Sequence, residues 1–143
     1  MNPQDDQVPA VRRPDPMYTA ESAFFWEAAE RGELMAQQCQ GCQQYLHPPR
    51  PMCPECLSMD LQPTQLSGRG KVYSVCSPQY PQIPAFDYPL LTALIDLEEG
   101  IRLLSNLVDV ELESVQPGMP VEVCFAATVG GRAVPQFRPE GNK

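Results

Sequence analysis

Four cysteines occur as two Cys-x-x-Cys pairs, and their spacing suits the binding of one metal ion. The pairs are Cys39 with Cys42 and Cys53 with Cys56. Each pair turns two sulfurs toward one point, and residues 43–52 allow two short strands to run out and back. Two disulfides are the alternative, but we find no signal peptide before the cysteines, and most of the chain lies outside the cluster. We therefore predict a structural zinc ion with these four ligands.

The remaining side chains offer little for catalysis. A zinc ion held by four thiolates has no open position for water, so we expect no Lewis-acid chemistry. His47 is the only histidine, and it lies between the two pairs, where four sulfurs already complete the coordination shell. Ser-His-Asp and Cys-His sites therefore lack a base. Glu98 and Glu99 precede a glycine, where a solvated turn is expected. The sequence predicts a binding or accessory protein without catalytic residues.

Charge and hydropathy limit the possible partners. The chain has 143 residues, with 10 Lys and Arg against 18 Asp and Glu, for a net charge of -8. Basic patches carry affinity for phosphates, so this charge disfavours nucleic acid. No run of about 18 apolar residues is present to cross a membrane, and we expect a soluble cytoplasmic protein. In that reducing compartment Cys76 and Cys124 are expected to be small buried side chains of strands.

The elements that position the cysteines begin with a tail and a helix. Residues 1–18 hold four prolines and few apolar side chains, so we expect an extended or disordered tail. Residues 19–33 are predicted to form a helix, which Thr19 can cap and Gly32 can end. Residues 34–62 form the predicted zinc ribbon. They are too short for a core of their own, so their fold depends on the metal, which supplies about 10–16 kcal/mol in such modules.

Residues 63–143 are predicted to form a domain made of strands. Glycine and proline turns separate five short apolar stretches, which match a small closed barrel of the OB type. The expected strands are residues 71–76, 89–97, 101–108, 121–126 and 132–137. A loop at 77–88, dense in proline and aromatic residues, follows the first strand. Loops of this length are usually functional or disordered. The fold class is therefore mostly β with one N-terminal helix.

Six aromatic side chains are candidates for a partner surface. Three of them are neighbours on the predicted helix and splay over more than half of its circumference, so a chain of this size can hardly bury all three. The other three belong to the 77–88 loop. Either set folds back over the protein, the loop as a flap on one end of the barrel, or it marks a partner surface. The candidates are Phe24, Phe25, Trp26, Tyr80, Phe86 and Tyr88.

Taken in order, the motifs closely resemble the domain-of-unknown-function 35 family, in which a rubredoxin-like zinc ribbon is joined to an OB-fold. The resemblance covers about residues 20 to 139. The motifs that carry it are Phe24-Phe25-Trp26-Glu27, Gly32-Glu33-Leu34, Cys39-x-x-Cys42, Pro48-Pro49-Arg50, Cys53-Pro54-x-Cys56, Ser67-Gly68-Arg69-Gly70-Lys71-Val72-Tyr73-Ser74, Leu97-Glu98-Glu99-Gly100 and Gly118-Met119-Pro120-Val121.

This resemblance implies an accessory subunit of an acyl-CoA enzyme complex whose catalytic residues belong to a thiolase-like partner. The implied partners are aldolases of steroid side-chain breakdown, acetyltransferases and the condensing complex of archaeal isoprenoid synthesis. We expect a heterotetramer around an enzyme dimer, in which the six aromatic residues contact the partner or the acyl-CoA. A steroid side-chain aldolase is our first choice, and an acetyltransferase or hydratase complex is the alternative. Some bacteria fuse the module to a MaoC-type hydratase; here we expect any hydratase to be a separate polypeptide.

Two functions of other classes stay open. Zinc ribbons and OB-folds both bind single-stranded nucleic acid, although the negative charge counts against this function. A rubredoxin-like site can also hold iron and carry electrons. Rubredoxins usually place glycine after each cysteine pair, whereas Gln43 and Leu57 follow here, which removes the small residues that let backbone amides approach the sulfurs.

Overall fold

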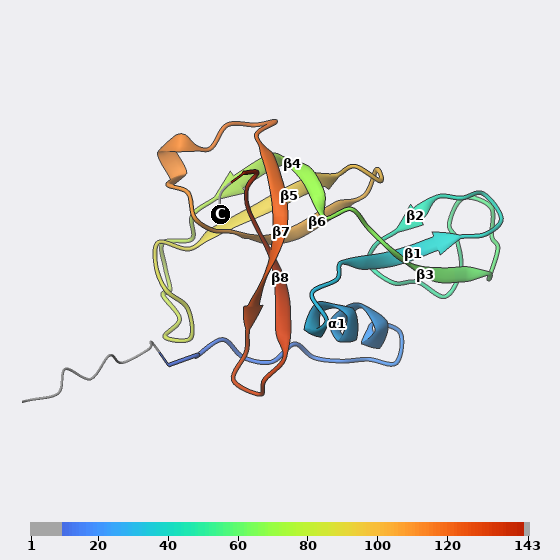
Figure 1. The fold of residues 1–143 in the computed structure, drawn as a ribbon, viewed down its shortest axis with the longest axis horizontal. Helices are drawn as coiled ribbons and strands as arrows, with labels where there is room; N and C mark the ends of the chain where they lie inside the picture. The colour runs from blue at the N-terminus through green and yellow to red at the C-terminus, as the bar shows by residue number, and fades with distance from the viewer. Residues whose placement is uncertain (1–9, 142–143) are drawn as a thin grey trace, which may run out of the picture.

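The computed structural model describes residues 10–141, which form one helix, a small sheet and a five-stranded barrel (Figure 1). Among these residues, no helix is long and apolar enough to span a bilayer. The elements in chain order are α1 (Ala23–Glu30), β1 (Met35–Cys39), β2 (Tyr45–Leu46), β3 (Leu61–Gln65), β4 (Arg69–Cys76), β5 (Leu91–Leu97), β6 (Arg102–Leu107), the 3-10 helix η1 (Leu112–Ser114), β7 (Pro120–Ala127) and β8 (Ala133–Pro139). The expected mostly β fold is confirmed.

The ribbon is a three-stranded antiparallel sheet in the order β2-β1-β3. Its small core consists of Cys39, Leu46 and Cys53, so two of the predicted ligands are themselves the buried centre of the ribbon. Strand β3 pairs with β1 along its whole length, from Leu61 opposite Cys39 to Gln65 opposite Met35. The ribbon sheet therefore continues three residues past position 62, where we expected the next domain to begin.

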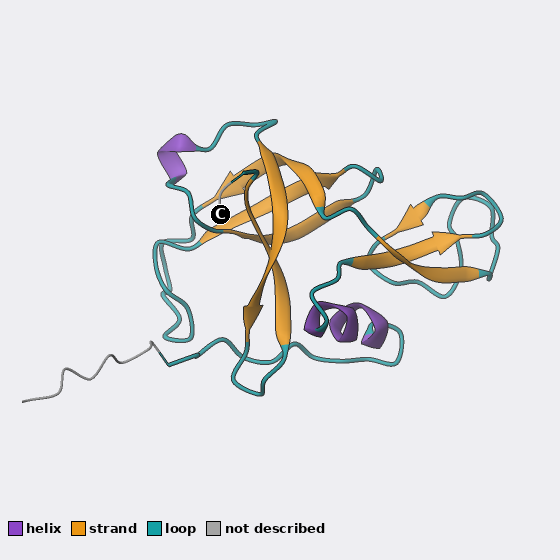
Figure 2. Ribbon diagram, viewed as in Figure 1, coloured by secondary structure: helices purple, strands orange, loops and turns teal. Residues whose placement is uncertain are grey.

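The five expected strands form a closed barrel (Figure 2). Their order around the barrel is β4-β5-β6-β8-β7. Strand β5 alternates strictly between buried and half-buried residues, so Ala93 and Ile95 face the interior. Phe137 of β8 is fully buried at its centre. Strands β6 and β8 run parallel and pair at Leu107 and Phe137. Because this closure is short, the side of the barrel between β6 and β8 needs cover from another element.

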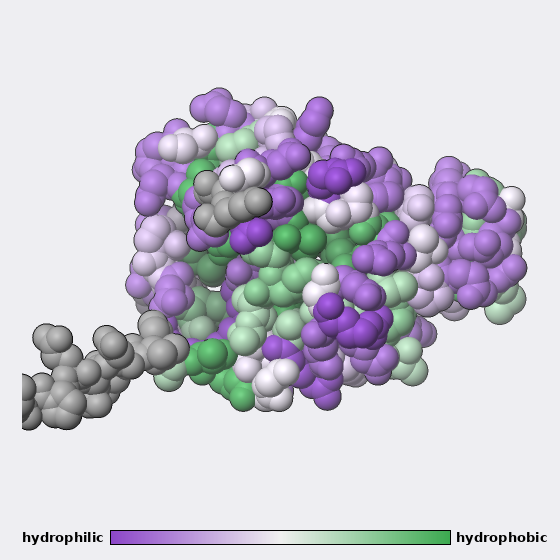
Figure 3. All heavy atoms as spheres, viewed as in Figure 1, coloured by the Kyte–Doolittle hydropathy of each residue, from purple (hydrophilic) through white to green (hydrophobic). Residues whose placement is uncertain are grey.

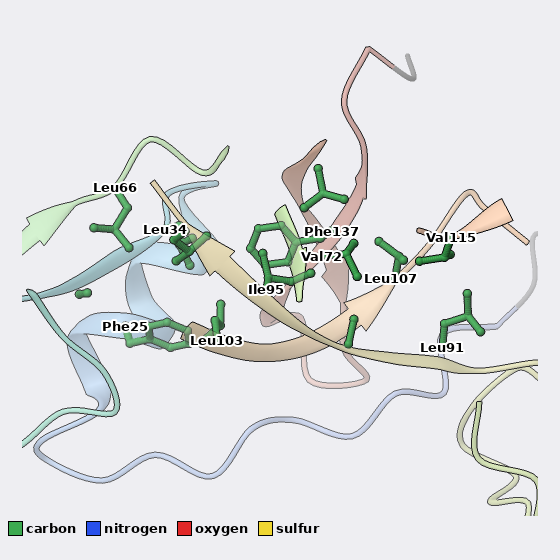
Figure 4. Close-up of a cluster of buried hydrophobic side chains, with 14 residues drawn as sticks. Phe25, Leu34, Leu66, Val72, Leu91, Ile95, Leu103, Leu107, Val115 and Phe137 are labelled. Carbon is green, nitrogen blue, oxygen red and sulfur yellow. The ribbon is translucent and has the colours of Figure 1, made fainter. Parts of the chain in front are cut away.

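Helix α1 supplies that cover, since Phe25 extends from it into the barrel core beside Leu103 (Figure 4). Ala28 and Ala29 are also buried, and their small side chains let the helix approach closely. The helix is shorter than expected at its start. Residue Thr19 and the N-cap Ser22 bond to each other through their side chains and backbone in a preceding turn, so regular helix begins at Ala23.

Residues 10–18, here called the strap, contain no helix or strand but lie against the barrel in an extended path (Figure 1). Hydrogen bonds hold the strap: the Val129 N–H donates to the Arg13 carbonyl at 2.9 Å, and the Gly130 N–H donates to the Asp15 carboxylate at 2.8 Å. The Thr128 hydroxyl donates to the same carboxylate. The expectation for residues 1–9 lies outside the described residues.

The expectation that Cys76 and Cys124 are buried is wrong for Cys76, which is exposed, while Cys124 is half-buried. Strand β4 has a register shift between Val72 and Ser74, where its pairing with β5 skips a residue. Past this bulge the alternation is reversed, so Val75 packs toward the core and Cys76 points outward. The sequence pattern did not reveal the bulge.

Candidate metal centre and partner surfaces

The four predicted cysteine ligands converge inside the ribbon. Their sulfur atoms all lie within 4.8 Å of one another. The Sγ atoms of Cys39 and Cys56 are 3.4 Å apart, and those of Cys42 and Cys53 are 3.7 Å apart. Tetrahedral zinc with Zn–S bonds of about 2.3 Å requires sulfur separations of about 3.8 Å. The donor set therefore fits a tetrahedral metal ion, and the four-cysteine cluster is a metal-binding site.

The two Cys-x-x-Cys turns share one backbone conformation. The Gln43 N–H donates to the Cys39 carbonyl at 2.9 Å, and the Leu57 N–H donates to the Cys53 carbonyl at 3.0 Å. Gln43 and Leu57 then adopt φ angles of 67° and 64°. This left-handed region favours glycine and is costly for other residues. Both turns thus adopt, without glycine, a backbone conformation that glycine would favour.

The sulfurs also affect one another's protonation. The Cys42 N–H donates to the Cys39 sulfur and lowers the pKa of Cys39 to about 6. The Gln44 N–H acts in the same direction on Cys42, but burial and the sulfurs of Cys53 and Cys39 outweigh it and raise the pKa of Cys42 to about 12. Four adjacent thiolates repel one another, so a bound cation is needed to keep all of them deprotonated.

His47 does not belong to the metal cluster. Within residues 10–141 the group of metal-ligating side chains consists of the four cysteines. The His47 ring instead packs on Phe25, with ring centroids 5.3 Å apart. Burial lowers the pKa of His47, so the imidazole is neutral at pH 7. Its role in the structure is to fill the junction between the ribbon and α1.

The helix aromatics divide between the core and a surface hollow. Phe25 is only 6% exposed and belongs to the core, whereas Phe24 and Trp26 are half-buried against it. Trp26 stacks on Tyr18 of the strap at 6.4 Å. A hollow of about 550 Å³ lies where α1 and the ribbon meet β6 and β8, and Trp26 and Leu104 are part of its wall. Apolar surface also gathers over β7 and β8 on the face that Figure 3 shows.

The loop aromatics lie elsewhere. Tyr80 is 92% exposed, and the Tyr88 hydroxyl accepts a hydrogen bond from the Ile83 N–H at 2.9 Å. The Arg13 guanidinium lies over the Phe86 ring, 5.0 Å from its centroid. Phe86 lines a second hollow of about 900 Å³, between the strap and the barrel. The structure therefore does not bring the six aromatic residues into one site, and their role as partner contacts stays a prediction.

The strap is the functional feature that sequence reasoning missed. OB-folds bind ligands with their second and third strands and with the loops after the first and fourth strands. The strap contacts both of these loops and the third strand. Arg12 pairs with Asp87 and donates to the Pro84 carbonyl at 2.7 Å, Arg13 donates to Asn106 of β6, and Asp15 accepts from the β7–β8 loop. Its charged residues among prolines could have indicated these contacts. An extended proline-rich segment loses little conformational entropy when it binds to the rest of the protein.

Comparison with known proteins places both halves of the chain in one family. The model of the ChsH2 rubredoxin-like zinc ribbon domain matches residues 26–62, and that of the ChsH2 C-terminal OB-fold domain matches residues 63–126. A DUF35 domain-containing scaffold protein of Pyrococcus furiosus is 36% identical over 104 residues, which cover 71% of this chain and 75% of the relative.

Two longer relatives carry names of enzyme subunits. A probable enoyl-CoA hydratase alpha subunit of Thermomonospora curvata is 38% identical over 136 residues, which cover 95% of this chain and 43% of the relative. The 3-oxo-4,17-pregnadiene-20-carboxyl-CoA hydratase alpha subunit of Mycobacterium tuberculosis is 32% identical over 123 residues, which cover 86% and 39%. The chain thus spans about two fifths of the length of these relatives.

Two solved structures share the architecture. A chain of the structure titled Ltp2-ChsH2(DUF35) aldolase superposes with a TM-score of 0.82 at 38% identity, covering 87% of this chain and 98% of that chain. A DUF35 protein of unknown function from Sulfolobus solfataricus superposes with a TM-score of 0.56 at 12% identity, covering 85% and 86%. The second likeness shows the fold alone.

Proposed function

This chain belongs to the ChsH2 family of DUF35 proteins, and from that premise we propose that it is a non-catalytic accessory subunit of an acyl-CoA enzyme complex. The observation that carries the proposal is the match to a chain of the Ltp2-ChsH2(DUF35) aldolase, which extends over 98% of that chain. A match of this extent supports a shared way of assembling with an enzyme. The proposed partner is a thiolase-like aldolase.

The partner performs the chemistry in this proposal. The bond that it cleaves is the carbon–carbon bond of a β-hydroxyacyl-CoA derived from a steroid side chain, and the products are a shortened carbonyl compound and an acyl-CoA. The structural relative is named an aldolase, which supports this choice. The names of the two longer relatives favour a hydratase complex as the second candidate. A hydratase partner would add water to an enoyl-CoA, so the two complexes are distinguished by their products.

Within the complex, this chain supplies a rigid body stabilised by metal. We propose zinc as the ion, because the sulfur separations suit tetrahedral Zn–S geometry and the matching family model is a zinc ribbon. Cys39, Cys42, Cys53 and Cys56 would hold it with no position left for water, so zinc contributes folding free energy rather than catalysis. Six free cysteines also fit a reducing compartment, and we propose the cytoplasm.

The strap disfavours the nucleic-acid alternative. It bridges the loops and the strand that OB-folds use for oligonucleotides. Charge adds to this steric argument, since the net charge of -8 repels phosphates. An accessory subunit needs no open OB surface if it binds its enzyme through other faces.

Co-expression with Ltp2, the protein named together with ChsH2 in the aldolase structure that this chain resembles, tests the proposal. We expect the two proteins to elute together from gel filtration, at a size that fits two copies of each, and we expect aldolase turnover and solubility of Ltp2 to depend on this chain. The isolated chain should neither cleave nor hydrate an acyl-CoA when it is purified from a host that lacks the aldolase and the hydratase. Separate elution combined with full activity of Ltp2 alone would refute the accessory role.

A further inference from the structure

The two cysteine turns have the same backbone but different surfaces. Around the first turn the side chains are almost all glutamines, whereas the second turn is flanked by three large apolar side chains that are exposed. The glutamines are Gln37, Gln38, Gln40, Gln43 and Gln44. The apolar residues, here called the apolar rim, are Met52, Leu57 and Met59, with exposed fractions of 43%, 65% and 76%. Because both turns fold alike, folding does not require this apolar surface.

Of the three rim residues, Leu57 has the conformation and exposure that cost the isolated chain most. Its φ of 64° lies in the left-handed region, where a side chain with a Cβ is disfavoured, and its apolar side chain faces water. Gln43 occupies the same place in the first turn with a φ of 67° and a polar side chain. The position therefore tolerates a polar residue, and glycine would suit it best. Leucine costs stability here through its backbone conformation and through its exposed apolar surface. We infer that the side chain gains binding free energy in contact with another protein.

Backbone hydrogen bonds gather the rim at one place. The Cys53 N–H donates to the Ser58 carbonyl at 2.9 Å and closes the second turn. Met52 precedes Cys53 and Met59 follows Ser58, so this hydrogen bond brings their two backbone positions together at the end of the turn that contains Leu57. Methionine side chains adapt their shape to a facing surface, which makes them common at protein interfaces.

We propose that the apolar rim docks into an apolar depression with a basic border on the enzyme partner. The proposal deepens the accessory-subunit function and rests on it. Charge identifies the border: residues 51–68 contain no lysine or arginine, but they contain the exposed acids Glu55 and Asp60. Four thiolates around a divalent ion add further negative charge. A surface that is both apolar and negative fits a protein with basic groups around the depression, and it repels nucleic acid.

The test pairs Leu57→Gly with Gln43→Gly. Each substitution places glycine at a residue with a left-handed φ and so removes backbone strain. Both variants should therefore unfold at a higher temperature than the wild type and keep their metal. Only Leu57→Gly removes a rim side chain. We expect it to raise the Kd for immobilised Ltp2 by about tenfold, while Gln43→Gly binds as the wild type does. Opposite changes in stability and affinity cannot arise from damage to the fold.

A second pair of variants tests the remaining contacts. Met52→Ser with Met59→Ser should weaken Ltp2 binding without loss of metal, and Glu55→Lys should slow association, most strongly at low salt. If the wild type binds Ltp2 but Leu57→Gly and the double methionine variant bind equally well, the rim proposal is wrong and the accessory role stands. If the wild type itself does not bind Ltp2, both proposals are overturned.

Discussion

Cys53 is fully buried in the ribbon, and its Sγ lies 3.7 Å from that of Cys42. Replacing it with serine leaves three sulfurs and one weak ligand in a segment whose core is made largely of cysteine. Zinc modules lose about 10–16 kcal/mol of binding free energy when the ion is lost. We expect Cys53→Ser to fall well below one zinc per chain by elemental analysis and to unfold the ribbon or become insoluble.

Cys124→Ser is the matched control, because Cys124 is half-buried in the barrel, outside the metal cluster. It should retain one zinc per chain. A soluble Cys53→Ser protein with unchanged metal content would contradict the assignment of the ligands. The same analysis separates zinc from iron, since a protein purified with a four-thiolate iron centre is coloured and one with zinc is colourless.

At this scale, the sequence predicted that the four cysteine sulfurs converge, because the information is local. Two residues between cysteines determine how a turn presents both sulfurs, and no distant contact alters that geometry. The role that we propose for Leu57 could not be predicted from local sequence. The sequence showed only that glycine was missing after each pair, whereas the left-handed φ and the exposure of the side chain had to be seen together.

The strap is the element whose structure differs most from expectation. Counting apolar residues suggested that residues 10–18 had nothing to pack, but hydrogen bonds and the ion pair between Arg12 and Asp87 hold them instead. These partners lie between 75 and 115 positions away in sequence, a distance that no local pattern reveals. By contrast, the hairpin of β5 and β6 followed directly from two apolar runs around Gly100, because turn and strands are adjacent.

Asp15 should control the attachment of the strap. The Thr128 hydroxyl, and then the Gly130 N–H, hold the pKa of Asp15 below its ordinary value. A depressed pKa means that the carboxylate stabilises the folded state above the unfolded pKa of about 3.9, and that this contribution is lost as pH falls through the folded pKa. We expect the Gly130 amide resonance in NMR spectra to titrate with a midpoint below 3.9 as the strap detaches.

Substitutions test the same attachment at neutral pH. Asp15→Ala should speed trypsin cleavage after Arg12 severalfold, because the strap is released. Gly130→Ala should do the same, since a Cβ there would clash with the Asp15 carboxylate. Asp60→Ala is the control, because it removes an exposed acid of the ribbon and leaves the strap in place. Equal cleavage rates in all four proteins would show that Asp15 does not hold the strap.

Across the whole molecule, function is divided among its parts. The ribbon gathers the four cysteines around a small core, Phe25 of α1 completes the barrel core, and the strap covers part of the surface that OB-folds commonly use. The surfaces left free carry the exposed Tyr80 on one side and the apolar rim of the ribbon on another. These exposed apolar surfaces lie on separate parts of the molecule, so each can be tested by its own substitutions.

Oligonucleotide binding separates the steric and the electrostatic reasons for excluding nucleic acid. We expect the wild type to show no saturable binding of fluorescent oligo-dT by anisotropy, with any Kd weaker than about 10⁻⁴ M at physiological salt. Asp15→Ala frees the OB surface but changes the net charge only from -8 to -7, so it should not bind either. Binding by Asp15→Ala alone would show that the strap, rather than the charge, is the barrier. Salt-dependent binding by the wild type would instead restore the nucleic-acid function and contradict the argument from charge.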